Sequence, residues 1–343
     1  MKKIKDNLDW KDFDKIENLG IQFMTIGMKS KSVDFSSPLE ETQYRNTLNM
    51  PEIPNDWIYK RQIKNMYQYN SDGFRNNFDL DDIDWSKCIA VFGCSNIFGK
   101  GVEQHHGICH YIQELTGLTA VNLGVEGASI RSTFNNAIHV LEKYYPKQMA
   151  IFWPGNNRIS LTYKWDLKDN NWSHIDMTGV EKQIMLHENL EPDSFGLMHN
   201  KQIHVNMRDL WPTVDETHFI DNQDVIYQQN LYKQVLKTIA RDRGMPLFEY
   251  SSARVKRPRV NALDQVEAEY PEHFAENFKY MGDYKNKKPG WHNLPDDHKN
   301  WWINRVCARD IGMFETNGGP GGHHFGPVIN KAIAKLILKN RIN

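Results

Sequence analysis

The chain has 343 residues, of which 40% are hydrophobic and 25% are charged, and its formal net charge is -1. This apolar content is enough for a large core, and the length corresponds to about two domains or one domain with large insertions. The near-zero charge argues against broad electrostatic binding of nucleic acid, and no apolar run approaches the roughly 20 residues that span a bilayer.

The N-terminal segment, residues 1 to about 85, is polar and irregular. Its first residues are basic but lack the apolar stretch of a signal peptide, so we expect synthesis in the cytoplasm. That expectation leaves room for later action elsewhere, for example in a virus particle. The acidic run from Asp79 to Asp84 follows no calcium-loop spacing and favours a solvated face. We interpret residues 1–85 as an extension packed on a core, because its aromatic side chains would be costly to leave in water.

From residue 86 onward, short apolar runs alternate with amphipathic stretches. The pattern predicts strands at 88–92, 119–123, 148–153 and 245–250, and helices at about 104–116, 130–144, 222–243 and 327–340. This alternation predicts an α/β fold, a three-layer α/β/α sandwich with a parallel sheet. Two polar, aromatic stretches, at about 161–220 and 255–305, interrupt the pattern. We interpret them as insertions in a core that spans residues 86–343.

The cysteine and histidine residues give little support for a disulfide framework or a metal site. The four cysteines form no CxxC pair, so neither a disulfide framework nor a zinc ribbon is expected, and reduced thiols fit a protein made in the cytoplasm. His106 and His110 have the i, i+4 spacing of some zinc ligands, but no Glu follows His106 to complete a zincin helix. The sequence therefore predicts no metal.

Polar residues follow the predicted strands at the end where ligands bind in open parallel sheets. Ser95 comes after the first strand, Gly127 after the second and Asn156 after the third, and His323 and His324 precede the last helix. Acyl transfer needs this combination of a nucleophile, donors for the oxyanion and a base.

Four blocks of the chain resemble the SGNH (GDSL-like) hydrolases. Gly93-Cys94-Ser95 resembles the family's Gly-Asp-Ser, with Cys94 in place of Asp. Residues 122–127 match an Asn followed by a Gly-x-x-Gly turn, residues 154–157 match the Gly-x-Asn-Asp block in part, and His324 matches the final histidine. The resemblance covers residues 86–160, 222–250 and 306–341, about half of the chain, and implies the flavodoxin-like SGNH fold.

The resemblance also implies roles for single residues. Ser95 is the expected nucleophile, and its backbone N–H, the Gly127 N–H and the Asn156 side chain form the expected oxyanion hole. His324 is the expected base, with His323 as the alternative. Asp310 resembles the family's aspartate displaced by a glycine-rich loop, and Glu315 is the second choice for the triad acid. No cofactor is expected.

Each role has a plain structural alternative. Ser95 is compatible with a helix cap, Gly127 with an ordinary turn and Asn156 with an Asx-turn, while Asp310 is compatible with a surface aspartate. Six tryptophans lie in or beside the insertions and fit either a sugar-stacking platform or local packing: Trp165, Trp172, Trp211, Trp291, Trp301 and Trp302.

The expected function is serine ester hydrolysis, with a small acyl group such as acetyl on a carbohydrate as the first choice of substrate. The expected partner is a small-molecule or carbohydrate ester, with no nucleic acid and no membrane. Two alternatives stay open. One is a non-catalytic binding or structural module, such as a phage particle protein, that kept the fold. The other is acyl transfer to an acceptor other than water. Oligomeric state and virion assembly stay open as well.

Overall fold

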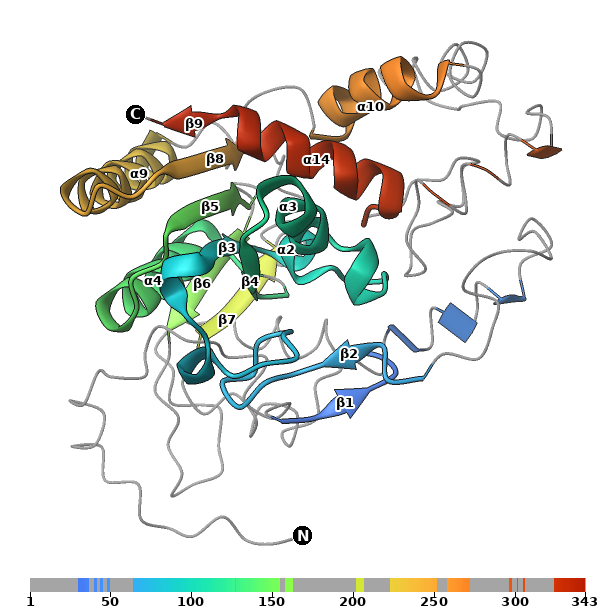
Figure 1. The fold of residues 1–343 in the computed structure, drawn as a ribbon, viewed down its shortest axis with the longest axis horizontal. Helices are drawn as coiled ribbons and strands as arrows, with labels where there is room; N and C mark the ends of the chain where they lie inside the picture. The colour runs from blue at the N-terminus through green and yellow to red at the C-terminus, as the bar shows by residue number, and fades with distance from the viewer. Residues whose placement is uncertain are drawn as a thin grey trace, which may run out of the picture.

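The computed structural model describes residues 30–36, 40–41, 44–45, 48–49, 64–126, 128–154, 158–162, 202–206, 223–251, 258–271, 296–297, 301, 305 and 324–342. Its centre is a five-stranded sheet in the order β4-β3-β5-β8-β9 (Figure 1). The first four strands are parallel, and β9 pairs antiparallel with β8. The strands are β3 (Cys88–Gly93), β4 (Thr119–Gly124), β5 (Gln148–Trp153), β8 (Leu247–Ser251) and β9 (Arg341–Ile342).

Helices cover both faces of this sheet, so the core has three layers. On one face α14 (Pro327–Lys339) lies between α3 (Ile108–Thr116) and α10 (Pro258–Glu269) and contacts both (Figure 1). On the other face, α4 (Ile130–Lys143) contacts α9 (Gln223–Asp242). This arrangement confirms the predicted α/β class with a parallel sheet.

The sequence of β3 explains why both faces are covered. All six of its residues are buried, which a strand between two helical layers requires. Ile89 and Val91 pack in the hydrophobic cluster that includes α3, α10 and α14, whereas Ala90 and Phe92 pack in the cluster that includes α4 and α9. Alternate side chains of one strand thus serve two separate cores.

Several elements differ from the sequence-based prediction. The helix expected over 104–116 is divided at Gly107 into the 3-10 turn η6 (Gln104–His106) and α3. The two presumed insertions hold regular structure, since β6 (Arg158–Thr162) and β7 (Gln202–Asn206) form an antiparallel pair and α10 lies in the second. The short C-terminal strand β9 was not predicted. In the described residues, no helix is long and apolar enough to cross a membrane.

The acidic run before β3 lies at the surface and in two 3-10 turns, η4 (Leu80–Asp82) and η5 (Trp85–Lys87). Asp81 forms an ion pair with Lys143 of α4 and accepts a hydrogen bond from the Tyr144 hydroxyl at 2.7 Å. Asp84 caps η5 by accepting from the Ser86 backbone N–H at 3.1 Å. Asp81 therefore ties the extension to α4, and Asp84 stabilises the turn that precedes β3, in agreement with the prediction of a solvated face.

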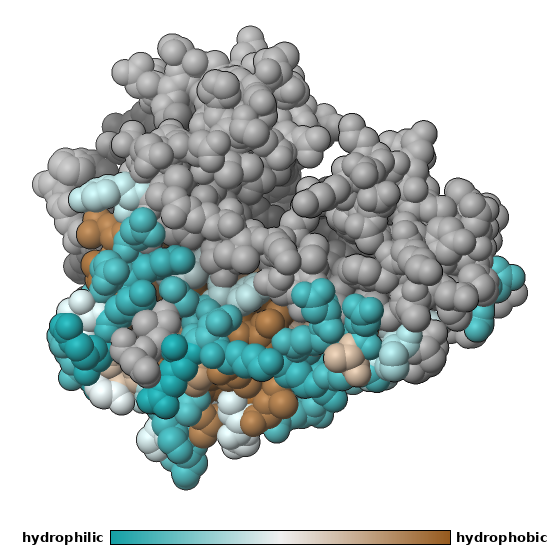
Figure 2. Space-filling model, turned by 90° about the horizontal axis from the view of Figure 1, so that it is seen from above, coloured by the Kyte–Doolittle hydropathy of each residue, from teal (hydrophilic) through white to brown (hydrophobic). Residues whose placement is uncertain are grey.

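The described surface mixes hydrophilic and hydrophobic residues, as the view from above Figure 1 shows (Figure 2). Two large hydrophobic side chains of α9, Tyr227 and Leu231, are 69% and 48% exposed. They lie one helical turn apart, so α9 presents a narrow apolar stripe on the described surface.

A buried arginine joins the N-terminal extension to the core. Arg75 is 1% exposed, and its guanidinium donates hydrogen bonds to the carbonyl oxygens of four residues: Met66, Phe98, Gly99 and Val102. Its Cζ atom also lies 4.3 Å from the ring centroid of Tyr67 in β2 (Tyr67–Gln68), which pairs with β1 (Ser32–Val33). Arg75 thereby fixes the loop that follows residues 95–98.

Tyr67 strengthens the same junction. Its hydroxyl accepts a hydrogen bond from the Gly101 backbone N–H at 2.8 Å and donates one to Glu40 Oε1 at 2.5 Å. Glu40 in turn accepts from the Ser36 backbone N–H at 2.6 Å. Tyr67 and Arg75 therefore both hold the loop over residues 99–102, and Glu40 holds Tyr67 in turn.

The extension also covers the free edge of the sheet at β4. The Asn76 side chain accepts a hydrogen bond from the Asn122 backbone N–H at 2.9 Å and donates one to the Asn122 carbonyl at 3.0 Å. One side-chain amide thus satisfies both backbone groups that an additional strand would bind.

Replacing Arg75 tests how much the core depends on this junction. Arg75→Ala removes the guanidinium donor from four carbonyl oxygens, and we expect the free energy of unfolding to fall by about 3 kcal/mol or more. Arg75→Lys keeps the charge but loses the forked geometry, so an intermediate loss is expected. Urea denaturation followed by circular dichroism measures both.

The exposed Arg131 on α4 provides the matched control, since Arg131→Ala should change stability by less than about 0.5 kcal/mol. Equal stability of Arg75→Ala and the wild type would contradict the role given to Arg75.

Candidate functional site

Ser95 begins the short helix α2 (Ser95–Phe98), directly after the carboxyl end of β3. The N-cap of this helix is Cys94, and no side chain caps it, so Ser95 does not have the capping role that the sequence left open. The serine is 4% exposed. Its carbonyl oxygen accepts hydrogen bonds from the Gly99 and Lys100 backbone N–H groups at 2.9 and 3.0 Å, which closes the turn after the helix.

Two glycines allow α2 to lie against the ends of β3 and β4. A Cβ atom on Gly93 would approach an Ile97 side-chain carbon to 2.5 Å, and one on Gly124 would approach the Phe98 backbone nitrogen to 2.4 Å. The second contact involves backbone, which has no rotamer to change, so glycine at 124 is required by close packing. The Val125 backbone N–H continues the contact by donating to the Gly93 carbonyl at 3.0 Å.

Asn122, the first residue of the second family-like block, has a structural role. It is 7% exposed, and its side chain accepts from the Gly124 backbone N–H at 3.0 Å and donates to the Phe98 carbonyl at 3.3 Å. Asn122 therefore links β4 to α2 and shapes the turn that leads to Glu126.

Glu126 and Lys100 form a mostly buried ion pair next to this turn, with side chains 18% and 13% exposed. Burial raises the pKa of the Glu126 carboxyl, but the Lys100 ammonium, which also hydrogen-bonds to it, and the charge of His324 outweigh burial. The pKa of Glu126 consequently lies below its ordinary value. The Ser36 side chain also lowers the pKa of Glu126, although its hydroxyl makes no well-formed hydrogen bond.

His324 therefore lies within electrostatic reach of the loop that follows β4, in the stretch just before α14. The Asn330 side chain on α14 fixes this stretch by donating hydrogen bonds to the Phe325 carbonyl at 3.0 Å and to the His106 carbonyl at 2.9 Å. The sequence analysis missed Glu126 and Lys100. Their only signal was that both flank predicted rim residues, Lys100 five residues after Ser95 and Glu126 just before Gly127.

The other predicted site residues lie outside the described residues: Gly127, Asn156, Asp310, Glu315 and His323. The chain on either side of Gly127 is described, and β5 ends at Trp153, beside the end of β3, two residues before the 155–157 segment. Of the predicted set, Ser95 and His324 alone can be placed.

Trp301, Cys88 and Cys109 have ordinary structural surroundings. Trp301 is 6% exposed and its ring centroid lies 5.8 Å from that of Tyr270, so this tryptophan belongs to the core and offers no open face for a sugar. Burial raises the pKa of Cys109 to about 12, and burial followed by the charge of Asp84 raises that of Cys88 to about 11. Such thiols are poor nucleophiles.

A pocket of about 350 Å³ opens beside the sheet edge at β4. It is lined by residues of the extension, η6, α3 and β4, among them Asn76, His105, His110 and Asn122. Its lining is predominantly polar, so it suits a small hydrophilic ligand better than an acyl chain.

No protein-family model matches the chain, and no curated protein matches it either. One solved structure is similar, a candidate lipolytic protein of the G-D-S-L family from Desulfitobacterium hafniense DCB-2. The match has 11% sequence identity and a TM-score of 0.20, and it covers 48% of this chain and 77% of that protein.

Proposed function

We propose that the protein is an SGNH-type serine hydrolase that acts on ester bonds. The observation that carries this proposal is the position of Ser95, which begins a helix at the carboxyl end of the central strand β3. Ligands of open parallel sheets bind at this edge. A serine there, with a histidine near the adjacent β4 loop, is the arrangement that nucleophilic acyl transfer uses.

The reaction follows from the proposed roles. His324 takes the hydroxyl proton of Ser95 as its Oγ attacks the ester carbonyl, and the backbone N–H groups of Ser95 and Gly127 and the Asn156 amide stabilise the oxyanion. The imidazolium then gives the proton to the alcohol, which leaves, and an acyl-serine remains. Water attacks this acyl group with His324 again as the base, and the acid is released.

A small acyl group such as acetyl on a carbohydrate remains our proposed substrate. Five of the six tryptophans that suggested a sugar lie outside the described residues, and the sixth, Trp301, is buried. An acceptor alcohol in place of water would turn the same steps into acyl transfer, so the two reactions share every proposed residue.

Labelling with a fluorophosphonate serine probe tests the nucleophile. We expect the wild type to be labelled and to hydrolyse p-nitrophenyl acetate, and both signals to disappear in Ser95→Ala because only an activated serine reacts with the probe. Ser71→Ala, at an exposed serine of the extension, should behave as the wild type.

A folded wild type that neither reacts with the probe nor turns over the ester would overturn the hydrolase proposal. The protein would then be better interpreted as a non-catalytic binding module. One observation favours that module. The Glu126 carboxylate, on which the charge of His324 acts, already forms an ion pair with Lys100, so its charge is balanced without the histidine.

The carboxylate that supports His324 is the second testable point. Asp310, with Glu315 as the second choice, is the proposed acid from the resemblance, and Glu126 is a further candidate because the charge of His324 acts on it. If Glu126 supports the imidazolium, Glu126→Gln should lower kcat by about tenfold or more. It should also move the acidic limb of the pH–rate profile to lower pH, because removing the negative charge makes protonation of the base less favourable.

Asp310→Asn is the paired variant in this experiment. A shifted profile in Asp310→Asn together with an unchanged profile in Glu126→Gln would assign the role to Asp310 and remove Glu126 from the site. Circular dichroism of both variants shows whether loss of the partner of Lys100 disturbs the fold.

A further inference from the structure

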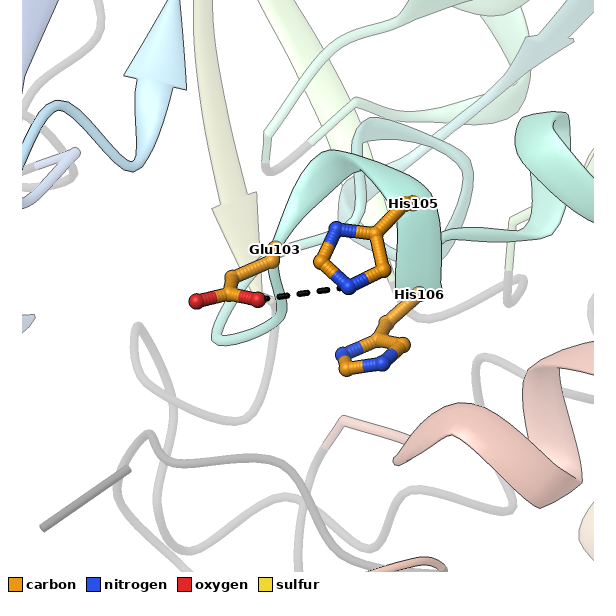
Figure 3. Close-up of side chains that lie close together, drawn as sticks. All are labelled: Glu103, His105 and His106. Atoms are coloured by element: carbon orange, nitrogen blue, oxygen red, sulfur yellow. Dashed lines mark ion pairs between the residues drawn. The ribbon is translucent and has the colours of Figure 1, made fainter. Parts of the chain in front are cut away.

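Three metal-binding side chains meet at the turn before α3. Glu103, His105 and His106 each offer a ligand atom, and these atoms all lie within 4.8 Å of one another. The Glu103 carboxylate faces the ring of His105, and the ring of His106 lies beside it on the same side of the turn (Figure 3). The centroids of the two rings are 4.0 Å apart.

The spacing of the donors matches one small metal ion. Two ligand atoms at about 2.1 Å from a tetrahedral zinc ion lie about 3.4 Å apart. Glu103 Oε2 and His105 Nε2 are 3.4 Å apart. The ligand atom of His106 lies within 4.8 Å of both of these atoms.

The backbone that carries these donors is held in place on both sides. The His106 N–H donates to the Glu103 carbonyl at 2.9 Å, and the Gly107 N–H donates to the Gln104 carbonyl at 3.1 Å. The His106 carbonyl accepts from the Asn330 side chain at 2.9 Å. Ligands on a rigid turn lose little conformational entropy when a metal binds.

Solvent reaches the cluster. The side chains of His105 and Glu103 are 60% and 26% exposed, and His105 and Gln104 also line the 350 Å³ pocket beside β4. An ion bound there has a path from solution and keeps one coordination position for water.

We propose that Glu103, His105 and His106 form a zinc-binding site at the rim of this pocket. Two imidazole nitrogens and one carboxylate oxygen suit zinc and its neighbours in the first transition row, whereas magnesium and calcium prefer sets made of oxygen alone. The set differs from the His106 and His110 pair that the sequence suggested, because His110 Nε2 lies 3.3 Å from Glu114 Oε1. The prediction of a protein without metal is replaced by this proposal.

Isothermal titration of the full chain with zinc chloride tests the site, using protein that carries no histidine tag and was treated with a chelator. We expect one strong zinc equivalent per chain. His105→Ala and His106→Ala should each weaken zinc binding about tenfold or more, and the double variant should abolish this equivalent. Glu103→Gln should weaken it as well, since the amide carries no charge.

His139→Ala is the matched control, because this histidine is described and lies outside both the cluster and the pocket. It should bind zinc as the wild type does, and magnesium chloride should give no comparable signal. Zinc binding that persists in the His105→Ala/His106→Ala double variant, or no zinc binding by the wild type at 100-fold excess, would overturn the proposal. Because His105 is exposed, its variant is expected to stay folded, which circular dichroism checks.

Discussion

The buried guanidinium of Arg75 is the interaction on which the rim of the sheet depends. A charge at 1% exposure is costly unless hydrogen bonds compensate for its burial, and here the two terminal nitrogens of the guanidinium donate to four backbone carbonyls. Three of these carbonyls belong to residues 98–102, the loop that directly follows Ser95 and α2. The polar extension thereby becomes part of the structure that holds Ser95, the proposed nucleophile, although it contributes no proposed catalytic group.

The same loop also forms an ion pair with the loop that follows β4. Lys100, at the centre of the Arg75-held loop, pairs with Glu126 after β4, so the two loops that leave the adjacent strands are connected by opposite charges. His324 acts on the same carboxylate from the stretch before α14. Lys100 and His324 are more than 200 residues apart in the sequence, and both interact electrostatically with the mostly buried carboxylate of Glu126.

Most of the core could be predicted from the sequence, because its elements carry strong local signals. The β3 run is continuously apolar, the β4 and β5 runs are mainly apolar, and α4 and α14 are amphipathic over three or more turns. The predictions failed where tertiary contacts decide the structure. The β9 strand has only two residues and exists through its pairing with β8. The division at Gly107 follows from hydrogen bonds of η6, and the pairing of β6 with β7 joins segments about 40 residues apart.

The same distinction applies to the candidate site. Ser95 could be located because it follows a recognisable strand, whereas the pairing of Lys100 with Glu126 depends on how two loops meet. The grouping of His105 with Glu103, in place of His106 with His110, likewise depends on a 3-10 turn that the periodicity did not reveal. Side-chain partners across loops carry no periodic signal in a single sequence.

The Asn76 side chain covers part of the backbone at the outer edge of the sheet, where strands of other molecules could pair. β4 is one of the two outer strands of the described sheet, and an outer strand offers its backbone as a template on which strands of other molecules can add. The Asn76 amide occupies both backbone groups of Asn122, midway along that strand. The extension thus covers the backbone of β4 at Asn122, and trimming the chain to its α/β core would expose these two groups to strands of other molecules.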